Sequence, residues 1–169
     1  VITSRVESDT TESLELGMKL SLLDNRLIVN TAAFKTEWDN LPTTIGLISD
    51  TCVVNASVVN NIGSAESQGV EVDATYLLDS WIFSLSASYL DTSRTNTRPP
   101  LIEGERLPLA ARTNASVGIQ NNFTMSGYSG FVRADVRYVG EYSSEVTQFD
   151  FPDGGDYVDA SLYLGITIN

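Results

Sequence analysis

Hydrophobic and polar residues alternate one by one along much of the chain. In the last segment, residues 156–169, one set of alternate positions is apolar throughout and the other is mostly polar. A helix would scatter the two sets around its circumference, whereas a strand separates them onto two faces. The segment therefore predicts a strand, and its apolar face consists of Val158, Ala160, Leu162, Leu164, Ile166 and Ile168.

The same alternation recurs in six further segments, which predicts an all-β fold of about seven antiparallel strands. The expected strands are residues 11–22, 26–39, 61–78, 81–94, 110–122, 129–143 and 156–169. The second strand is ambiguous, because Asn30 and Thr36 fall on the face that its larger apolar residues would form. Those apolar residues are Ile28, Ala32, Phe34 and Trp38.

Short and long connections alternate between the expected strands. Tight turns are expected at residues 23–25, 79–80 and 121–127, and long polar loops at residues 40–60, 92–108 and 143–155. Outer-membrane β-barrels have short turns at one end of their strands and long loops at the other. Because bacterial single-chain barrels have even strand counts, seven strands predict a section of a larger transmembrane barrel with unpaired edges.

The aromatic residues also favour a membrane barrel, because amphipathic rings gather at both membrane interfaces. Trp81 follows a short turn, and four other rings lie near the long loops: Trp38, Tyr89, Tyr138 and Tyr142. The alternative is a soluble extracellular all-β binding or adhesion domain, in which the apolar faces pack together across a sandwich. The exposure of one residue set discriminates the two: Val132, Val136, Leu162, Leu164, Ile166 and Ile168.

Composition excludes several classes of protein. The chain carries 22 Asp and Glu against 10 Lys and Arg, a net charge of -12, which argues against nucleic-acid binding. It has no histidine, so a Ser-His-Asp or Cys-His catalytic relay cannot form, and we expect no enzyme activity and no cofactor. No apolar run approaches the roughly 18 residues of a membrane-spanning helix. The chain begins at Val1 without a leader, so we expect a processed protein or a piece of a longer one.

Several ordered motifs resemble the barrel of TonB-dependent receptors. Residues 61–71 read NIGSAESQGVE, similar to the family's N-x-G-x-A-x-x-x-G-V-E stretch. Before it come ELGMK at 15–19, LDNRL at 23–27 and NTAAF at 30–34, which resemble the family's E-L-G-x-K strand and its L-x-x-R-L and N-x-A-x-F hairpin. After it, SLSASY at 84–89 and LPLA at 107–110 are similar to the next hairpin and its L-P-x-x-P exit, although Ala111 replaces the final proline.

The resemblance implies a fold, a function and a location. The family consists of bacterial outer-membrane importers, each a twenty-two-stranded barrel around an N-terminal plug, and ferric siderophores are their commonest substrates. It implies that this chain is about a third of such a barrel, from its C-terminal half, without the plug or the terminal strands. The implied partners are TonB (through the missing plug), outer-membrane lipid and lipopolysaccharide, and a metal chelate.

Extracellular loops recognise substrate in this family, so the candidate substrate-binding residues are the arginines of the second long loop. Guanidinium groups bind carboxylate or catecholate oxygens in a planar, bidentate manner. The four candidates are Arg94, Arg98, Arg106 and Arg112. The alternative is a solvated loop whose charges only aid solubility.

Charged residues also occupy the polar faces of two expected strands, where the resemblance implies that they face the lumen and the plug. These are Glu71, Asp73, Arg133, Asp135 and Arg137. The acidic residues of the third long loop do not match the spacing of an EF-hand, so no metal site is predicted. Cys52 has no internal partner, and it either pairs with a missing part of the receptor or is a lone buried thiol.

Overall fold

The computed structural model describes residues 6–47, 56–61, 63–98, 101–143 and 154–167. Cys52, Ile168 and part of the third long loop lie outside these residues. Nine strands are present in the described part: β1 (Thr10–Leu22), β2 (Leu27–Asp39), β3 (Pro42–Leu47), β4 (Ala56–Asn61), β5 (Ser64–Leu78), β6 (Trp81–Thr95), β7 (Thr113–Met125), β8 (Tyr128–Val139) and β9 (Tyr157–Thr167). No helix in it is long and apolar enough to cross a membrane.

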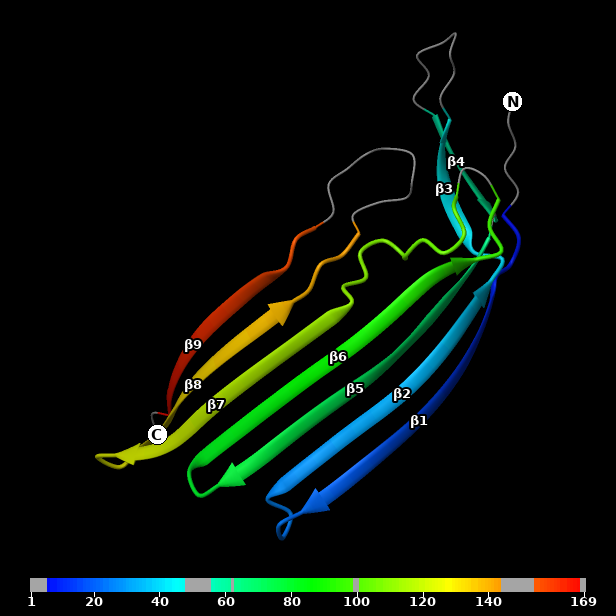
Figure 1. The fold of residues 1–169 in the computed structure, drawn as a ribbon. Coiled ribbons are helices and arrows are strands. Elements are labelled where there is room, and N and C mark those ends of the chain that lie inside the picture. Colours follow the sequence, from blue (N-terminus) through cyan, green and yellow to red (C-terminus); the bar gives the residue numbers. More distant parts are fainter. Residues whose placement is uncertain (1–5, 48–55, 62, 99–100, 144–153, 168–169) are drawn as a thin grey trace.

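Seven of the strands form one antiparallel sheet in the order β1-β2-β5-β6-β7-β8-β9. Figure 1 shows this sheet as a single curved layer that does not close on itself, with short turns at one end and long connections at the other. Strands β3 and β4 form a separate hairpin at the long-loop end (Figure 1). The fold is thus an open section of a barrel wall.

Some boundaries differ from those expected. Residues 40–60, expected as a loop, contain β3 and all but the last residue of β4, paired from Pro42 with Asn61 to Leu47 with Ala56. Residues 121–125, expected as a turn, extend β7, and the turn is confined to Ser126 and Gly127, which both have positive φ. Residues 110–112 precede β7 and do not belong to it.

The strand register separates two chemically opposite faces. One row of mutually paired residues crosses all seven strands and is entirely apolar: Leu20, Val29, Ala74, Leu85, Val117, Val136 and Ala160. The adjacent row on the other face is entirely polar: Lys19, Asn30, Asp73, Ser86, Ser116, Arg137 and Asp159. Because neighbouring positions of a strand point to opposite sides, the sheet has one apolar face and one polar face.

The apolar face is exposed, which decides against a sandwich. Of the six residues that discriminate the two folds, the five described ones are exposed: Leu162 by 76%, Leu164 by 69%, Ile166 by 55%, Val136 by 50% and Val132 by 39%. A sandwich would bury these side chains against a second sheet. The soluble sandwich is therefore the wrong alternative for this chain.

The register of strand β2 resolves the face assignment that the sequence left ambiguous. Its residues on the apolar face are Leu27, Val29, Thr31 and Ala33, which pair with even-numbered residues of β1 and β5. Ile28, Phe34 and Trp38 lie instead on the polar face. Trp38 is therefore not a ring at the lipid interface, and its indole Nε1 donates a hydrogen bond of 2.6 Å to Asp9 Oδ2.

Apart from glycines, buried residues of the described chain occur only at the long-loop end. Val139 ends β8, and the other seven form what we call the loop-end cluster, drawn from the starts of β3 and β5, the end of β6 and the connection to β7. The members of the loop-end cluster are Leu41, Thr43, Ser64, Ala65, Thr92, Arg94 and Leu101. The rest of the sheet has two accessible faces, so the packed interior of the described residues lies beneath the loops.

Candidate functional site

The connection between β6 and β7 folds back onto the end of β6. Strand β7 pairs with β6 only as far as Tyr89 and Thr113, so the last residues of β6 have a free edge on that side. The loop occupies this edge: Arg94 N donates to Glu105 O at 2.7 Å, and Gly104 N donates to Arg94 O at 2.9 Å. Figure 1 shows the connection running along the long-loop end before it enters β7.

Each arginine of the candidate substrate site has a different environment. Arg94 is 4% exposed, and burial lowers the pKa of its guanidinium, an effect that the nearby Glu105 carboxylate opposes. Arg112 is exposed and its Nη2 lies 3.3 Å from Asp91 Oδ1. Arg106 Nη2 donates to Ala110 O at 2.9 Å, while its buried Nε has no hydrogen-bond partner among the described residues. Arg98 is exposed.

The five charged residues expected to face a lumen all lie on the polar face of the sheet. Glu71 and Asp73 stand on β5, and the other three on β8. Arg133 binds Asp135 through two parallel contacts, Nε to Oδ2 at 2.7 Å and Nη2 to Oδ1 at 2.6 Å. This pair lies beside Gly118, where a Cβ would come within 2.5 Å of Asp135 Oδ1, so the glycine makes room for the ion pair.

Two shallow hollows on the polar face hold the remaining charges. One, of about 340 Å³, is lined by residues of β1, β2 and β5, which include Glu15, Lys19, Glu71 and Asp73. The other, of about 160 Å³, is lined by hydroxyls and an amide, together with Arg137. Sequence analysis identified Glu71, Asp73 and Arg137 but not the hollows, because the residues that line each hollow come from different strands.

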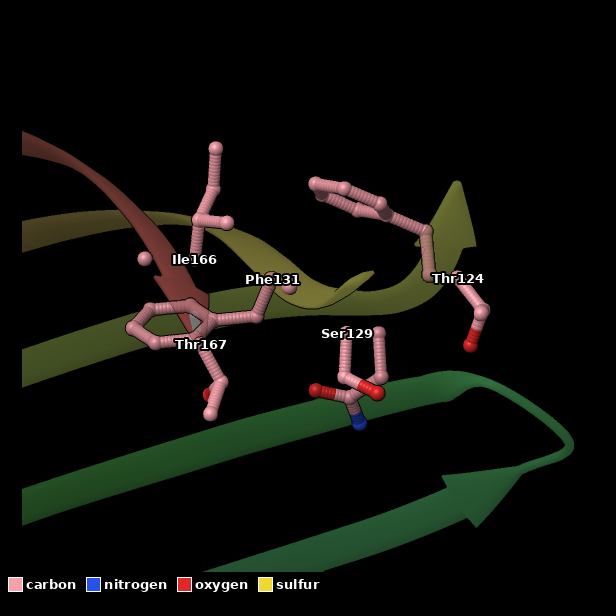
Figure 2. Close-up of a pocket in the computed structure, with 9 residues that line it drawn as sticks. Thr124, Ser129, Phe131, Ile166 and Thr167 are labelled. Atoms are coloured by element: carbon pink, nitrogen blue, oxygen red, sulfur yellow. The ribbon is translucent and has the colours of Figure 1, made fainter. Parts of the chain in front are cut away.

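Aromatic rings cover cross-strand glycines, a feature that sequence analysis missed. A hollow of about 460 Å³ at the turn end of β7, β8 and β9 is lined by Phe123 and Phe131, and Figure 2 shows Phe131 and Ile166 among its side chains. Phe123 pairs with Gly130, and Phe131 pairs with Gly165. A Cβ at either glycine would collide with the paired ring. The feature consists of a phenylalanine paired with a glycine on the neighbouring strand, and it cannot be recognised from the sequence until the strand register is known.

The apolar face has the dimensions of a membrane-spanning band. On β6 it runs from Trp81 to Tyr89, which is nine residues, within the roughly 9–11 that a tilted membrane strand needs. Aromatic rings gather at its turn end, where Phe83 lies 6.3 Å from Trp81 and 6.1 Å from Tyr76 between ring centroids. Tyr89 stands at the other end, as expected from the sequence.

Beyond the band, the same face becomes charged towards the long loops. Lys35 Nζ lies 2.9 Å from Glu37 Oε1 and 3.1 Å from Glu66 Oε2. Hydrogen bonds to Glu37, which has the larger effect, and to Glu66 raise the pKa of the Lys35 ammonium. Lys35 and Glu37 are exposed and Glu66 is half-buried, so the pairs mark where the apolar band ends and contribute little to stability.

Comparisons with known proteins agree with this geometry. The family model described as the TonB dependent receptor-like β-barrel matches residues 6–169. A comparison with curated proteins finds no match.

Two solved structures share the fold. The ferric yersiniabactin uptake receptor FyuA from Yersinia pestis is similar with a TM-score of 0.68 and 22% identity, over 91% of this chain and 22% of its own. The FrpB iron transporter from Neisseria meningitidis (F3-3 variant) is similar with a TM-score of 0.68 and 12% identity, over 96% of this chain and 25% of its own. The chain thus spans a quarter or less of the length of these two structures. With an exposed apolar band and a matching family model, the chain belongs to the TonB-dependent receptors of the bacterial outer membrane, as part of their β-barrel.

Proposed function

We propose that this chain is a wall section of a receptor that imports a scarce nutrient across the outer membrane, with energy supplied through TonB. The observation that carries the proposal is the pair of adjacent seven-residue rows, one apolar for lipid and one polar for an aqueous interior. The family match supports it. The chain supplies about seven strands of a twenty-two-stranded barrel, and the plug that contacts TonB belongs to another part of the receptor.

The substrate proposed is a ferric siderophore. The names of the two similar structures, a ferric yersiniabactin uptake receptor and an iron transporter, favour this class of ligand. The apolar face contacts outer-membrane lipid and lipopolysaccharide, and the charged residues of the polar face contact the plug. Glu71, Asp73 and Arg137 are the side chains available for that contact, since Arg133 and Asp135 bind each other.

Two of the four candidate arginines are the proposed ligand contacts. Arg98 is exposed, and Arg106 is partly exposed, with one guanidinium hydrogen bond among the described residues, from Nη2 to Ala110 O. An unused guanidinium N–H can donate to a carboxylate or catecholate oxygen of an anionic chelate. Arg94 is buried and Arg112 contacts Asp91, so neither has a guanidinium placed for a ligand.

Replacing Arg106 or Arg98 with glutamine in the full-length receptor is expected to weaken ligand binding. A hydrogen bond to a charged group contributes about 1.5–3 kcal/mol, so each variant is expected to lose roughly tenfold or more in affinity. The measurement is equilibrium binding of Fe(III) complexed by 2,3-dihydroxybenzoate or by citrate to purified receptor in detergent. Uptake of radioactive iron by cells with and without TonB tests import itself.

The matched control is Arg26→Gln, at the opposite end of the sheet, where Arg26 Nε donates to Leu23 O at 3.2 Å. This variant is expected to bind both complexes like the unmodified receptor. An equal affinity loss in the Arg26 and Arg106 variants would remove the loop arginines from the binding site. Iron uptake that does not depend on TonB would contradict the proposed mode of import.

A further inference from the structure

We propose that Arg94 is a positioning residue that fastens the β6–β7 loop against the end of β6 and so sets where Arg98 and Arg106 stand. Only the part about ligand affinity rests on the proposed function. The fastening itself concerns the fold of this chain and can be measured without ligand. This role differs from direct substrate contact, which the sequence suggested for Arg94.

Both main-chain polar groups of Arg94 are hydrogen-bonded to the loop. Its N–H donates to Glu105 O at 2.7 Å and its C=O accepts from Gly104 N at 2.9 Å. Two residues earlier, the buried Thr92 Oγ1 accepts from Leu107 N at 3.1 Å. Together these bonds extend the sheet edge with loop residues 104–107, where β7 no longer reaches.

The side chain of Arg94 is buried, at the end of β6 to which the loop is hydrogen-bonded. It is 4% exposed, although arginine is seldom buried to this degree, and Leu101 of the loop is 5% exposed in the same cluster. The guanidinium attracts the Glu105 carboxylate, which belongs to the fastened segment. A buried cationic side chain next to this segment therefore adds electrostatic attraction to the backbone bonds.

A second set of contacts joins the β6–β7 loop to the base of the β3–β4 hairpin. Leu41 N donates to Gly63 O at 2.8 Å, and Gly63 is close to Thr97, whose Cγ2 lies 3.3 Å from the position of a Cβ at the glycine. Thr97 Oγ1 donates to Leu101 O at 3.5 Å. Arg98 follows Thr97 and Arg106 follows Glu105, so each proposed ligand contact is one residue from a fastened one.

The test combines amide hydrogen exchange with ligand binding in the full-length receptor carrying Arg94→Met, which keeps most of the apolar volume and removes the charge. Exchange at the amides of Gly104 and Leu107 is expected to accelerate at least tenfold, while exchange at Leu85 in mid-strand stays unchanged. Affinity for the Fe(III) complexes is expected to fall several-fold, and Arg94→Lys is expected to restore part of both, because it restores the charge.

Unchanged exchange at Gly104 and Leu107 in Arg94→Met would overturn the proposal. If this variant does not fold, Thr92→Val tests the same fastening, since it removes the acceptor of Leu107 N, and slow exchange at Leu107 in that variant would overturn it as well. Faster exchange with unchanged affinity supports the fastening and instead removes Arg98 and Arg106 as ligand contacts. The two proposals therefore fail in different measurements.

Discussion

Replacing Leu85 with arginine is expected to destabilise the folded receptor in a bilayer by about 2–4 kcal/mol, the range for a cation on the lipid face of a barrel near the bilayer midplane. Leu85 is the middle residue between Trp81 and Tyr89 on β6, and it is 44% exposed on the apolar face. Its neighbours across the sheet are Ala74 and Val117. None of these groups can accept a hydrogen bond from a guanidinium through its side chain, so the charge must be solvated by distorting the bilayer or the strand.

The control for this substitution is Ser86→Arg, one residue further along the same strand. Ser86 belongs to the polar row and pairs with Asp73, so an arginine there meets a carboxylate and water. Its effect is expected to stay below about 1 kcal/mol. Urea unfolding of the two variants in lipid vesicles measures the difference, and heat-modified gel mobility confirms folding. Equal losses for Leu85→Arg and Ser86→Arg would mean that the two faces do not meet different solvents.

Alternation predicted the apolar face correctly on strands in which apolar and polar residues alternate regularly. On β8 and β9, the apolar residues chosen from the sequence, such as Val136 and Leu164, lie on the face that the register makes apolar. Lipid cannot solvate polar groups, so the outer positions are almost all apolar, with Thr31 on β2 as an exception within the band. The polar face has no such constraint. It accepts Phe34 and Trp38 on β2, and these two large rings made that strand ambiguous.

The chemistry of the candidate site could be predicted, but its geometry could not. The sequence identified a loop rich in arginine, yet nothing in the residue type separates the buried Arg94 from the exposed Arg98. That difference accompanies backbone bonds between Arg94 and residues 104–105, and such bonds do not depend on a particular side chain. The β3–β4 hairpin was missed for a related reason: residues 40–60 have no period-two pattern, and the pairing of these strands does not need one.

Replacing Gly69 with valine is expected to destabilise the barrel by about 1–3 kcal/mol, the usual effect of adding atoms to a filled space. Gly69 pairs with Phe34 on β2, and the ring of Phe34 lies over it. A Cβ at Gly69 would stand 2.5 Å from Tyr89 O and 2.8 Å from Phe34 Cζ. The first of these atoms belongs to the backbone of β6, so relief requires the two strands to move apart.

Gly17→Val is the matched control, because Gly17 is a glycine on the same polar face, in β1. The nearest atoms to a Cβ there are Thr31 O at 3.7 Å and Glu15 Oε1 at 4.0 Å, which are ordinary contacts. Urea unfolding in vesicles is expected to show a loss for Gly69→Val and little or none for Gly17→Val. Equal effects would mean that valine's branching in a strand, and not the collision, determines the result.

Combining Gly69→Val with Phe34→Ala separates the two collisions. Removing the ring relieves the contact with Phe34 but leaves the contact with Tyr89 O. Gly69→Val is therefore expected to lower the stability of the Phe34→Ala variant by less than it lowers the stability of the unmodified receptor, but still to lower it. Full recovery would mean that the collision with the ring causes the whole effect, and that the spacing between the β5 and β6 backbones contributes nothing. Partial recovery indicates that the glycine serves both the covering aromatic ring and the close approach of two strands.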